Sequence, residues 1–226
     1  MEYVEIGRAS SERGEVVLRE RRADAGPAVL ELRVNGVFVM DTCETTSERA
    51  LARHSLALVD DPRTVLLGGL GLGFTAHELL SDPRVERVDV VELEEAIIGW
   101  MRDGTITHGP ALLADRRINV INADIAIAIA ETPGPTYDLV LLDVDNGPGY
   151  LVQATNAAVY ERAFLARCAA ALQLGGAVAV WSANDAPELQ QTLIEVFGAC
   201  ERTACPVRLQ HRDEEYLLYH SRVAGQ

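Results

Sequence analysis

The chain has 226 residues, of which 48% are hydrophobic, which is enough for one sizeable core and predicts one main domain. Its 34 acidic and 20 basic residues give a formal net charge of -14, which argues against nucleic acid or an anionic membrane as a partner and favours a cationic small molecule. All of these basic residues are arginines, and a chain without lysine can neither form a Schiff base nor supply a P-loop lysine.

Short β-branched runs separated by turn signals make up the first part of the chain. Glu15 to Glu20 and Ala28 to Val34 are predicted strands. Asn35-Gly36 follows the second strand and precedes Val-Phe-Val, and this arrangement is the strongest short-range signal of a β-hairpin. The pattern therefore predicts a small β module.

A helical pattern follows this module. It covers Ser47 to Leu58, with Thr45 or Thr46 available as its cap. Asp60-Asp61-Pro62 then interrupts the pattern. We expect residues 1–60 to form an N-terminal β-hairpin module with a linking helix, and residues 61–226 to form the main domain.

From Thr64 onward, apolar runs alternate with helix signals. The predicted strands begin at Val65 and then cover Val85 to Glu92, Ile118 to Ile121, Leu139 to Asp143 and Ala177 to Trp181. Helices are predicted up to Leu80, over Glu94 to Arg102, and after each of the later strands. Strands that are apolar on both faces and alternate with helices are typical of a parallel sheet in a doubly wound α/β fold.

Two segments in the second half of the chain depart from the alternation of parallel strands and helices. Ile125 to Ala130 has the period of two that favours a strand, but Asp124 is a good N-cap and alanine favours helix, so we predict a helix. At the end of the chain, Glu201 to Val207 and Glu215 to Ser221 predict two strands that pair as an antiparallel hairpin on the sheet edge.

The spacing of cysteine and histidine bears on metal binding and on the cellular compartment. The four cysteines form no C-x-x-C pair and the five histidines no metal-ligand pattern, so we expect no metal. Dispersed thiols fit a reducing compartment. The acidic start lacks the apolar segment of a signal peptide, and no apolar run reaches the length of a membrane span. We therefore expect a cytoplasmic protein.

A glycine loop is the first candidate for chemistry. Gly69, Gly71 and Gly73 lie between a strand and a helix, where glycine lets the backbone approach a ligand and the helix offers free N–H groups. Such a loop can also be purely structural. Glu92 ends the next strand about 20 residues on, where an acid accepts hydrogen bonds from the ribose hydroxyls of an adenosine-type ligand. The alternative for Glu92 is a solvated acid at a strand end.

Further acids follow the third and fourth strands. Asp124 is a candidate acceptor for an adenine amino group or a plain N-cap, and the two roles can coexist. Asp143, Asp145 and Asn146 end a buried strand, and open α/β sheets bind ligands at that edge. The acids predict an anionic pocket for a cationic substrate, in which an acid takes the proton of an amine nucleophile. Asp145 and Asn146 can alternatively shape a turn.

These motifs together resemble the spermidine synthase (polyamine aminopropyltransferase) family over about Gly14 to Val223. Asn35-Gly36-Val37-Phe38 is similar to the family's D-G-hydrophobic-Q hairpin, Gly69 to Gly73 to its G-G-G-D-G loop, and Tyr137 to Pro148 to its Y-D-hydrophobic-D-S-S-D-P segment. Under this resemblance Glu92 matches the ribose-binding acid, Asp124 the adenine-side acid, and Asp143 the proposed catalytic aspartate.

The resemblance implies a Rossmann-like class I methyltransferase fold behind a small β module, with residues 61–226 as the nucleoside-binding catalytic domain. It also implies a homodimer or larger oligomer, decarboxylated S-adenosylmethionine as co-substrate, and transfer of an aminopropyl group to a cationic small-molecule amine. Asp145 would then assist Asp143, and Asp145 and Asn146 would contact the substrate.

Several positions depart from the family pattern, mostly in the amine half of the site. Leu72 replaces the aspartate that faces the donor's aminopropyl amine, and Val39 replaces the hairpin glutamine. Thr46-Ser47 replace a Tyr-His pair. Trp181 ends the fifth strand where the family commonly has glutamine, so we assign it to the substrate pocket.

Three functions remain open on the sequence. The first is aminopropyl transfer, or transfer of a related alkyl group, to an unusual amine. The second is an S-adenosylmethionine-dependent methyltransferase, because the glycine loop and Glu92 fit that class equally well and Leu72 costs a methyl donor little. The third is a non-catalytic nucleoside-binding homologue, which Asp143 counts against.

Overall fold

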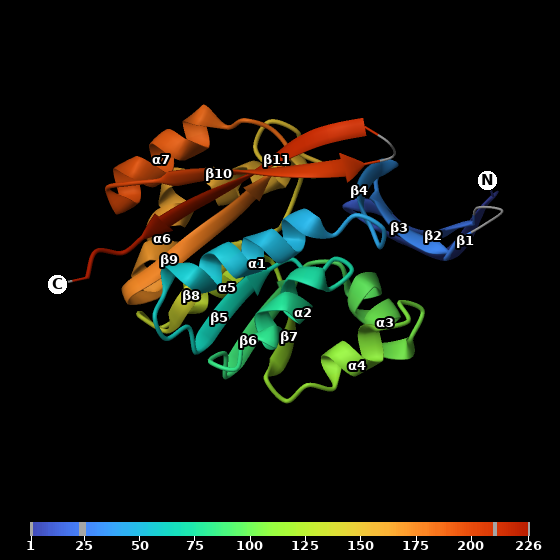
Figure 1. Cartoon of the computed structure of the whole chain (residues 1–226), viewed down its shortest axis with the longest axis horizontal. Helices are drawn as coiled ribbons and strands as arrows, with labels where there is room; N and C mark the ends of the chain where they lie inside the picture. The colour runs from blue at the N-terminus through green and yellow to red at the C-terminus, as the bar shows by residue number, and fades with distance from the viewer. Residues whose placement is uncertain (1, 23–25, 210–211, 226) are drawn as a thin grey trace.

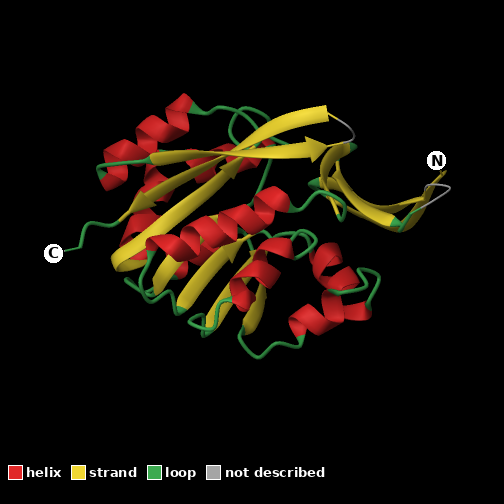
Figure 2. Cartoon of the chain, viewed as in Figure 1, coloured by secondary structure: helices red, strands yellow, loops and turns green. Residues whose placement is uncertain are grey.

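The computed structural model describes residues 2–22, 26–209 and 212–225, and their strands form two sheets (Figures 1 and 2). A four-stranded sheet has the order β1-β2-β3-β4, and a seven-stranded sheet has the order β10-β11-β9-β8-β5-β6-β7. The small sheet projects from one end of the body, and the chain's C-terminus lies at the opposite end (Figure 1).

The small sheet is antiparallel throughout. Its strands are β1 (Glu2–Ser11), β2 (Gly14–Arg22), β3 (Val29–Val34) and β4 (Val37–Asp41). The predicted hairpin is confirmed: Asn35 and Gly36 connect β3 to β4 with φ angles of 52° and 76°, and positive φ at both central residues matches the turn to the twist of the strands. The strand β1 was not predicted, because it is largely polar and pairs along one edge with β2.

The body confirms the predicted parallel sheet. Its parallel strands are β5 (Thr64–Gly68), β6 (Arg87–Glu92), β7 (Ile118–Asn122), β8 (Tyr137–Leu142) and β9 (Leu172–Ser182). The predicted C-terminal hairpin is also confirmed: β11 (Arg212–Arg222) lies antiparallel to β9, and β10 (Glu201–Leu209) pairs antiparallel with β11 at the edge.

Helices cover both faces of this sheet (Figure 2). One face carries α1 (Thr46–Leu58), α2 (Phe74–Ser81), α3 (Glu95–Asp103) and α4 (Gly109–Leu113), and the other carries α5 (Ile125–Glu131), α6 (Arg162–Ala171) and α7 (Pro187–Phe197). A 3-10 helix, η1 (Ala154–Tyr160), precedes α6. Neither α4 nor η1 was predicted.

The two faces bury two separate hydrophobic clusters. Along β5, for example, Val65 and Leu67 belong to the cluster under α1 to α4, while Leu66 between them belongs to the cluster under α5 to α7. Because successive side chains of a strand point to opposite faces, a strand buried on both sides needs a continuous apolar run. None of the described helices is long and apolar enough to cross a membrane.

Two local predictions about helix starts have different outcomes. The segment after Asp124 is helical, as predicted, and the Asp124 carboxylate accepts a hydrogen bond from the Ala126 N–H at 2.7 Å. Thr45 is the N-cap residue of α1, but its side chain makes no capping hydrogen bond. Helix α1 packs against α2 and the β8–β11 half of the large sheet, and the division of the chain at residue 60 stays a prediction.

Candidate active site

A cavity lies at the carboxyl ends of the parallel strands, under the small sheet. Eight of the nine predicted site residues line it, namely Gly69, Gly71, Glu92, Asp124, Asp143, Asp145, Asn146 and Trp181. Gly73 is the exception, since it is the N-cap residue of α2 with a φ of 84°. The opposite wall is apolar and comes from β3 and β4, with Leu32, Val34, Val39 and Met40.

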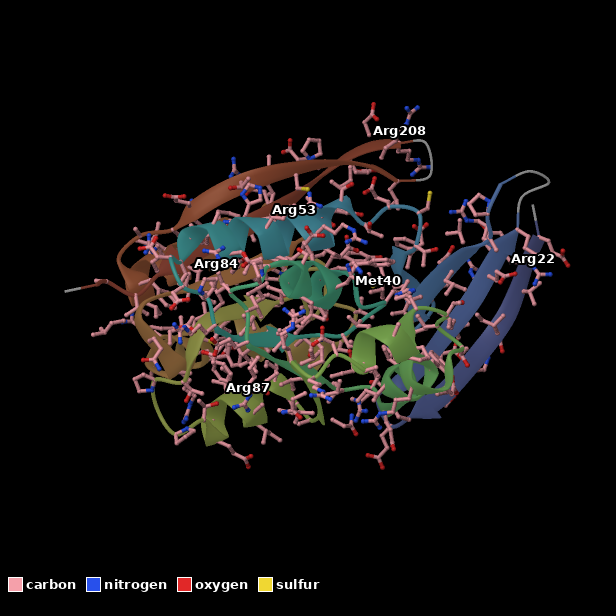
Figure 3. All side chains as sticks on the ribbon, turned by 60° about the horizontal axis from the view of Figure 1, so that its bottom comes forward. Arg22, Met40, Arg53, Arg84, Arg87 and Arg208 are labelled. Carbon is pink, nitrogen blue, oxygen red and sulfur yellow. The ribbon has the colours of Figure 1, made fainter. Side chains whose placement is uncertain are left out.

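The glycine loop brings the ends of β5 and β8 together. Gly69 has a φ of 93°, and a Cβ atom at this position would lie 2.0 Å from the carbonyl oxygen of Asp143. On the other side, the Met40 sulfur accepts a hydrogen bond from the Leu72 N–H at 3.2 Å. Figure 3 shows Met40 at the junction between the small sheet and the body. The loop therefore needs glycine to fit between β8 and the small sheet.

Leu72 does not face the cavity. Its side chain is fully buried in the core cluster that it shares with α2 and α3. The side chain at the position of the family's donor-facing aspartate therefore packs in the core of this chain.

Glu92 ties the glycine loop to the next helix. Its carboxylate accepts hydrogen bonds from the N–H groups of Leu70 at 2.9 Å and Glu94 at 2.8 Å. Only 7% of the residue is exposed, which excludes the alternative of a solvated acid. Burial raises the pKa of Glu92, and the backbone hydrogen bonds oppose that rise.

Asp143 lies directly after β8. The Thr75 hydroxyl donates a hydrogen bond to its carboxylate at 2.7 Å. Burial raises the pKa of Asp143 to about 6, and the Thr75 hydrogen bond opposes this shift. At neutral pH such a carboxylate is mostly ionised and can still take up a proton, which is what a general base requires.

Asp145 organises the loop that follows. Its carboxylate accepts hydrogen bonds from the backbone N–H groups of Asn146, Val152 and Gln153, at 2.7, 2.7 and 3.2 Å, and from the side-chain amide of Asn156 at 2.8 Å. Val152, Gln153 and Asn156 line the cavity themselves. The turn-shaping role considered for Asp145 is therefore present, whatever contact it makes with a ligand.

Trp181 lines the cavity at the end of β9. Trp181 is 8% exposed, and its ring packs edge-on against Tyr216 on β11 with the centroids 4.8 Å apart. Within the described part of the chain, the indole nitrogen of Trp181 has no hydrogen-bond partner.

Glu48 on α1 also lines the cavity, and the sequence reasoning missed it. The signal was available, because Glu48, Leu51, Ala52 and Ser55 follow the i, i+3, i+4, i+7 spacing of one helix face, and all are buried. The Ser47 hydroxyl donates a hydrogen bond to Glu48 at 2.8 Å. Burial, followed by the charge of Asp143, raises the pKa of Glu48 to about 7.

The charged side chains that line the cavity have one sign. Among the described residues, its charged lining side chains are all acidic: Glu48, Glu92, Glu94, Asp124, Asp143 and Asp145. This arrangement attracts a cationic ligand and disfavours a carboxylate.

Comparison with known proteins agrees with this geometry. Residues 44–209 match the family model of the spermine/spermidine synthase domain. Among solved structures, a spermidine synthase in complex with the transition-state analogue AdoDATO is similar, with a TM-score of 0.83 and 16% identity over 98% of this chain and 74% of that one. This likeness confirms the predicted α/β methyltransferase-like fold with a small N-terminal sheet.

The matches to curated relatives cover a smaller share of those proteins than the structural match does. Putrescine N-methyltransferase 3 of Nicotiana tabacum is 28% identical over 54% of this chain and 31% of that protein. Polyamine aminopropyltransferase 2 of Pseudomonas aeruginosa is 30% identical over 69% of this chain and 45% of that protein. The chain thus spans less than half the length of these relatives.

Proposed function

The chain belongs to the spermine/spermidine synthase family, and on that premise we propose that it is a transferase that moves an aminopropyl group from decarboxylated S-adenosylmethionine to an amine. The observation that carries the proposal is the acidic cavity at the carboxyl edge of the sheet, which Glu92, Asp124 and Asp143 all line.

The nucleoside end is formed by the glycine loop and two acids. Glu92 accepts hydrogen bonds from the ribose hydroxyls, and Asp124 accepts one from the adenine amino group while it caps α5. Gly69 and Gly71 let the backbone approach the donor closely. The burial of Glu92 supports this role, because a buried carboxylate that still lines a cavity favours a hydrogen-bonding ligand.

The transfer step belongs to Asp143. It takes a proton from the acceptor ammonium, and the nitrogen lone pair then attacks the carbon next to the sulfonium. The carbon–sulfur bond breaks with its electrons moving to sulfur, and methylthioadenosine leaves. Alignment of the two reactants and the negative field of the cavity supply most of the rate. Asp145, Asn146 and Trp181 border the acceptor end.

The charge of the lining supports the decarboxylated donor over intact S-adenosylmethionine. The carboxylate of the intact donor would enter a cavity whose described charged side chains are all acids. Removal of that carboxylate leaves a donor with positive charge only, which pairs with the acids.

A methyltransferase is the second candidate. Position 72 matches the family's donor-facing aspartate but holds a leucine that packs in the core, so it supplies no carboxylate for the aminopropyl amine of the donor. The similarity to putrescine N-methyltransferases supports the same alternative.

One experiment separates these functions. The protein is incubated with decarboxylated or intact S-adenosylmethionine and a panel of amines, and the products are identified by mass spectrometry. Methylthioadenosine with an aminopropylated amine supports the proposal, and S-adenosylhomocysteine supports methyl transfer. If neither forms while methylthioadenosine still binds, the protein is a non-catalytic nucleoside-binding homologue and the proposal is refuted.

The proposal extends to the quaternary structure and the cellular location. By resemblance to the family we infer a homodimer whose residues 61–226 form the catalytic domain. From the spacing of cysteine and histidine in the sequence we infer a cytoplasmic location and no use of a metal. Light scattering coupled to gel filtration tests the dimer, and activity that survives dialysis against a chelator is expected if no metal takes part.

A further inference from the structure

We propose that Glu48 is a second carboxylate that contacts the acceptor amine, so that the amine nitrogen is bound by an acid from α1 and an acid from the end of β8. This inference rests on the proposed function for its reaction step, but its test is a binding measurement that needs no turnover.

Glu48 lies on the part of α1 that borders the cavity. The helix α1 packs across β8 to β11, the half of the sheet away from the ribose-binding edge at β6. Glu48 in the first turn of α1 lines the same cavity as Asp143 and Trp181. The carboxylate therefore borders the cavity on the side where the acceptor enters, away from Glu92.

Glu48 is a buried acid. Only 8% of the residue is exposed, and an ionised carboxylate in such a place is costly unless it is paired with a cation or hydrogen-bonded. The hydroxyl of Ser47 provides one hydrogen bond, at 2.8 Å. An ammonium group in the cavity would supply the opposite charge.

None of the electrostatic partners of Glu48 in the described part of the chain is a cation, and Arg49, the next residue of α1, pairs with Glu78 on α2 at 2.9 Å instead. The titratable residues that interact electrostatically with it are Asp143 after β8, Glu44 before α1, Cys205 on β10 and Tyr216 on β11, and all four are acids. Burial and Asp143 raise the pKa of Glu48 to about 7, while burial raises the pKa of Asp143 to about 6. A bound cation favours the ionised form of both carboxylates. Near neutral pH, Glu48 and Asp143 together therefore carry more negative charge with a cation bound than in the empty cavity.

The wall beside the two acids fits the rest of such a ligand. Trp181 borders the cavity, and its buried indole nitrogen has no partner among the described residues, although a buried indole N–H normally finds one. Aromatic rings attract cations and bury methylene groups. The combination selects a primary amine that enters as an ammonium with an aliphatic chain.

The proton balance of the step includes both acids. The acceptor ammonium gives one proton to the pair formed by Glu48 and Asp143, and the neutral amine attacks the donor carbon. The product is a secondary ammonium, methylthioadenosine leaves neutral, and the pair returns its proton to water. Two acids allow one to accept the proton while the other keeps a charge next to the nitrogen.

The test is a calorimetric titration of 1,4-diaminobutane, and separately of butylamine, into protein saturated with methylthioadenosine. We expect Glu48→Gln to weaken amine binding about 10- to 100-fold, because one hydrogen-bonded charge pair is lost. The affinity for methylthioadenosine should stay the same. Glu188→Gln is the matched control, since Glu188 is an exposed acid in the first turn of α7 that does not line the cavity, and it should leave amine binding unchanged.

The pH dependence provides a readout that a purely structural role would not change. Amine affinity of the wild type should rise as the pair loses its proton between about pH 6 and pH 7. Without Glu48, only Asp143 remains, whose pKa burial raises to about 6, so the rise should be centred near pH 6 and lose its part near pH 7. Glu48→Asp retains the charge and should recover part of the affinity.

Three results would overturn the inference: amine binding that is unchanged in Glu48→Gln, loss of methylthioadenosine binding together with amine binding, or no binding of either amine to the wild type. Amine binding that depends on Glu48 in a protein that forms no methylthioadenosine from the donor would instead contradict the proposed function and leave this site in place.

Discussion

Substitution of Glu92 tests the nucleoside site most directly, and the structure sets the choice of substitution. The carboxylate accepts two backbone hydrogen bonds in a buried place, from Leu70 and Glu94. Glu92→Ala would leave both N–H groups without an acceptor, at about 1–3 kcal/mol each. That loss, about 2–6 kcal/mol in total, is a large share of the 5–15 kcal/mol that stabilises a typical domain. We therefore expect Glu92→Ala to destabilise the fold, which the sequence alone did not indicate.

Glu92→Gln separates binding from stability. The amide keeps the shape and one oxygen acceptor, so we expect about 1–3 kcal/mol of destabilisation, from the loss of one hydrogen bond. The ribose loses its charged acceptor, and the affinity for methylthioadenosine should fall at least about tenfold, which corresponds to about 1.4 kcal/mol.

The assay combines calorimetric titration with methylthioadenosine and urea unfolding monitored by circular dichroism. Glu86→Gln is the control, since Glu86 lies just before the other end of β6, is exposed, and should change neither quantity. Unchanged methylthioadenosine affinity in Glu92→Gln would remove Glu92 from the site. Unchanged unfolding in Glu92→Ala would refute the reasoning about the two backbone hydrogen bonds.

Three further substitutions test other parts of the site. Asp143→Asn should lower turnover about 10²- to 10⁴-fold in a steady-state assay, with methylthioadenosine affinity unchanged. Wild-type turnover should fall as the pH drops through about 6, because only the ionised carboxylate accepts a proton. Near-normal turnover of the variant would place the base elsewhere. Asp145→Ala should release the loop that its four hydrogen bonds secure and make residues 146–156 sensitive to limited proteolysis; an unchanged cleavage pattern would contradict that role. Leu72→Asp should lower the melting temperature by burying a charge in the core, and a stable variant with a changed donor preference would show instead that residue 72 reaches the donor.

Much of the fold was predictable because its signals are local. The strands of the body are buried on both faces, so each one shows as a continuous apolar run between helix signals. The turn at Asn35-Gly36 requires positive φ at both residues, and that preference is visible in two letters of sequence. The positions of Glu92 and Asp143 were predictable for a related reason, since parallel strands all end at the same sheet edge.

The remaining features depended on contacts between segments far apart in the chain. The polar strand β1 exists because β2 offers an edge to pair with, and no periodicity reports that. Leu72 faces the core because Met40 and β8 confine the glycine loop, so a family comparison at one position could not tell which way its side chain points.

The candidate site shows the same division between sequence and tertiary structure. The presence of several acids at the ends of neighbouring strands was predictable, because strand ends and turn residues are encoded locally. The packing of distant segments brings Glu48 from α1 and Asp143 into one cavity, and it directs the Asp145 carboxylate to hydrogen bonds with the following loop. The physical reason is that burial and charge pairing depend on which distant segments approach, and these two quantities determine how each carboxylate behaves.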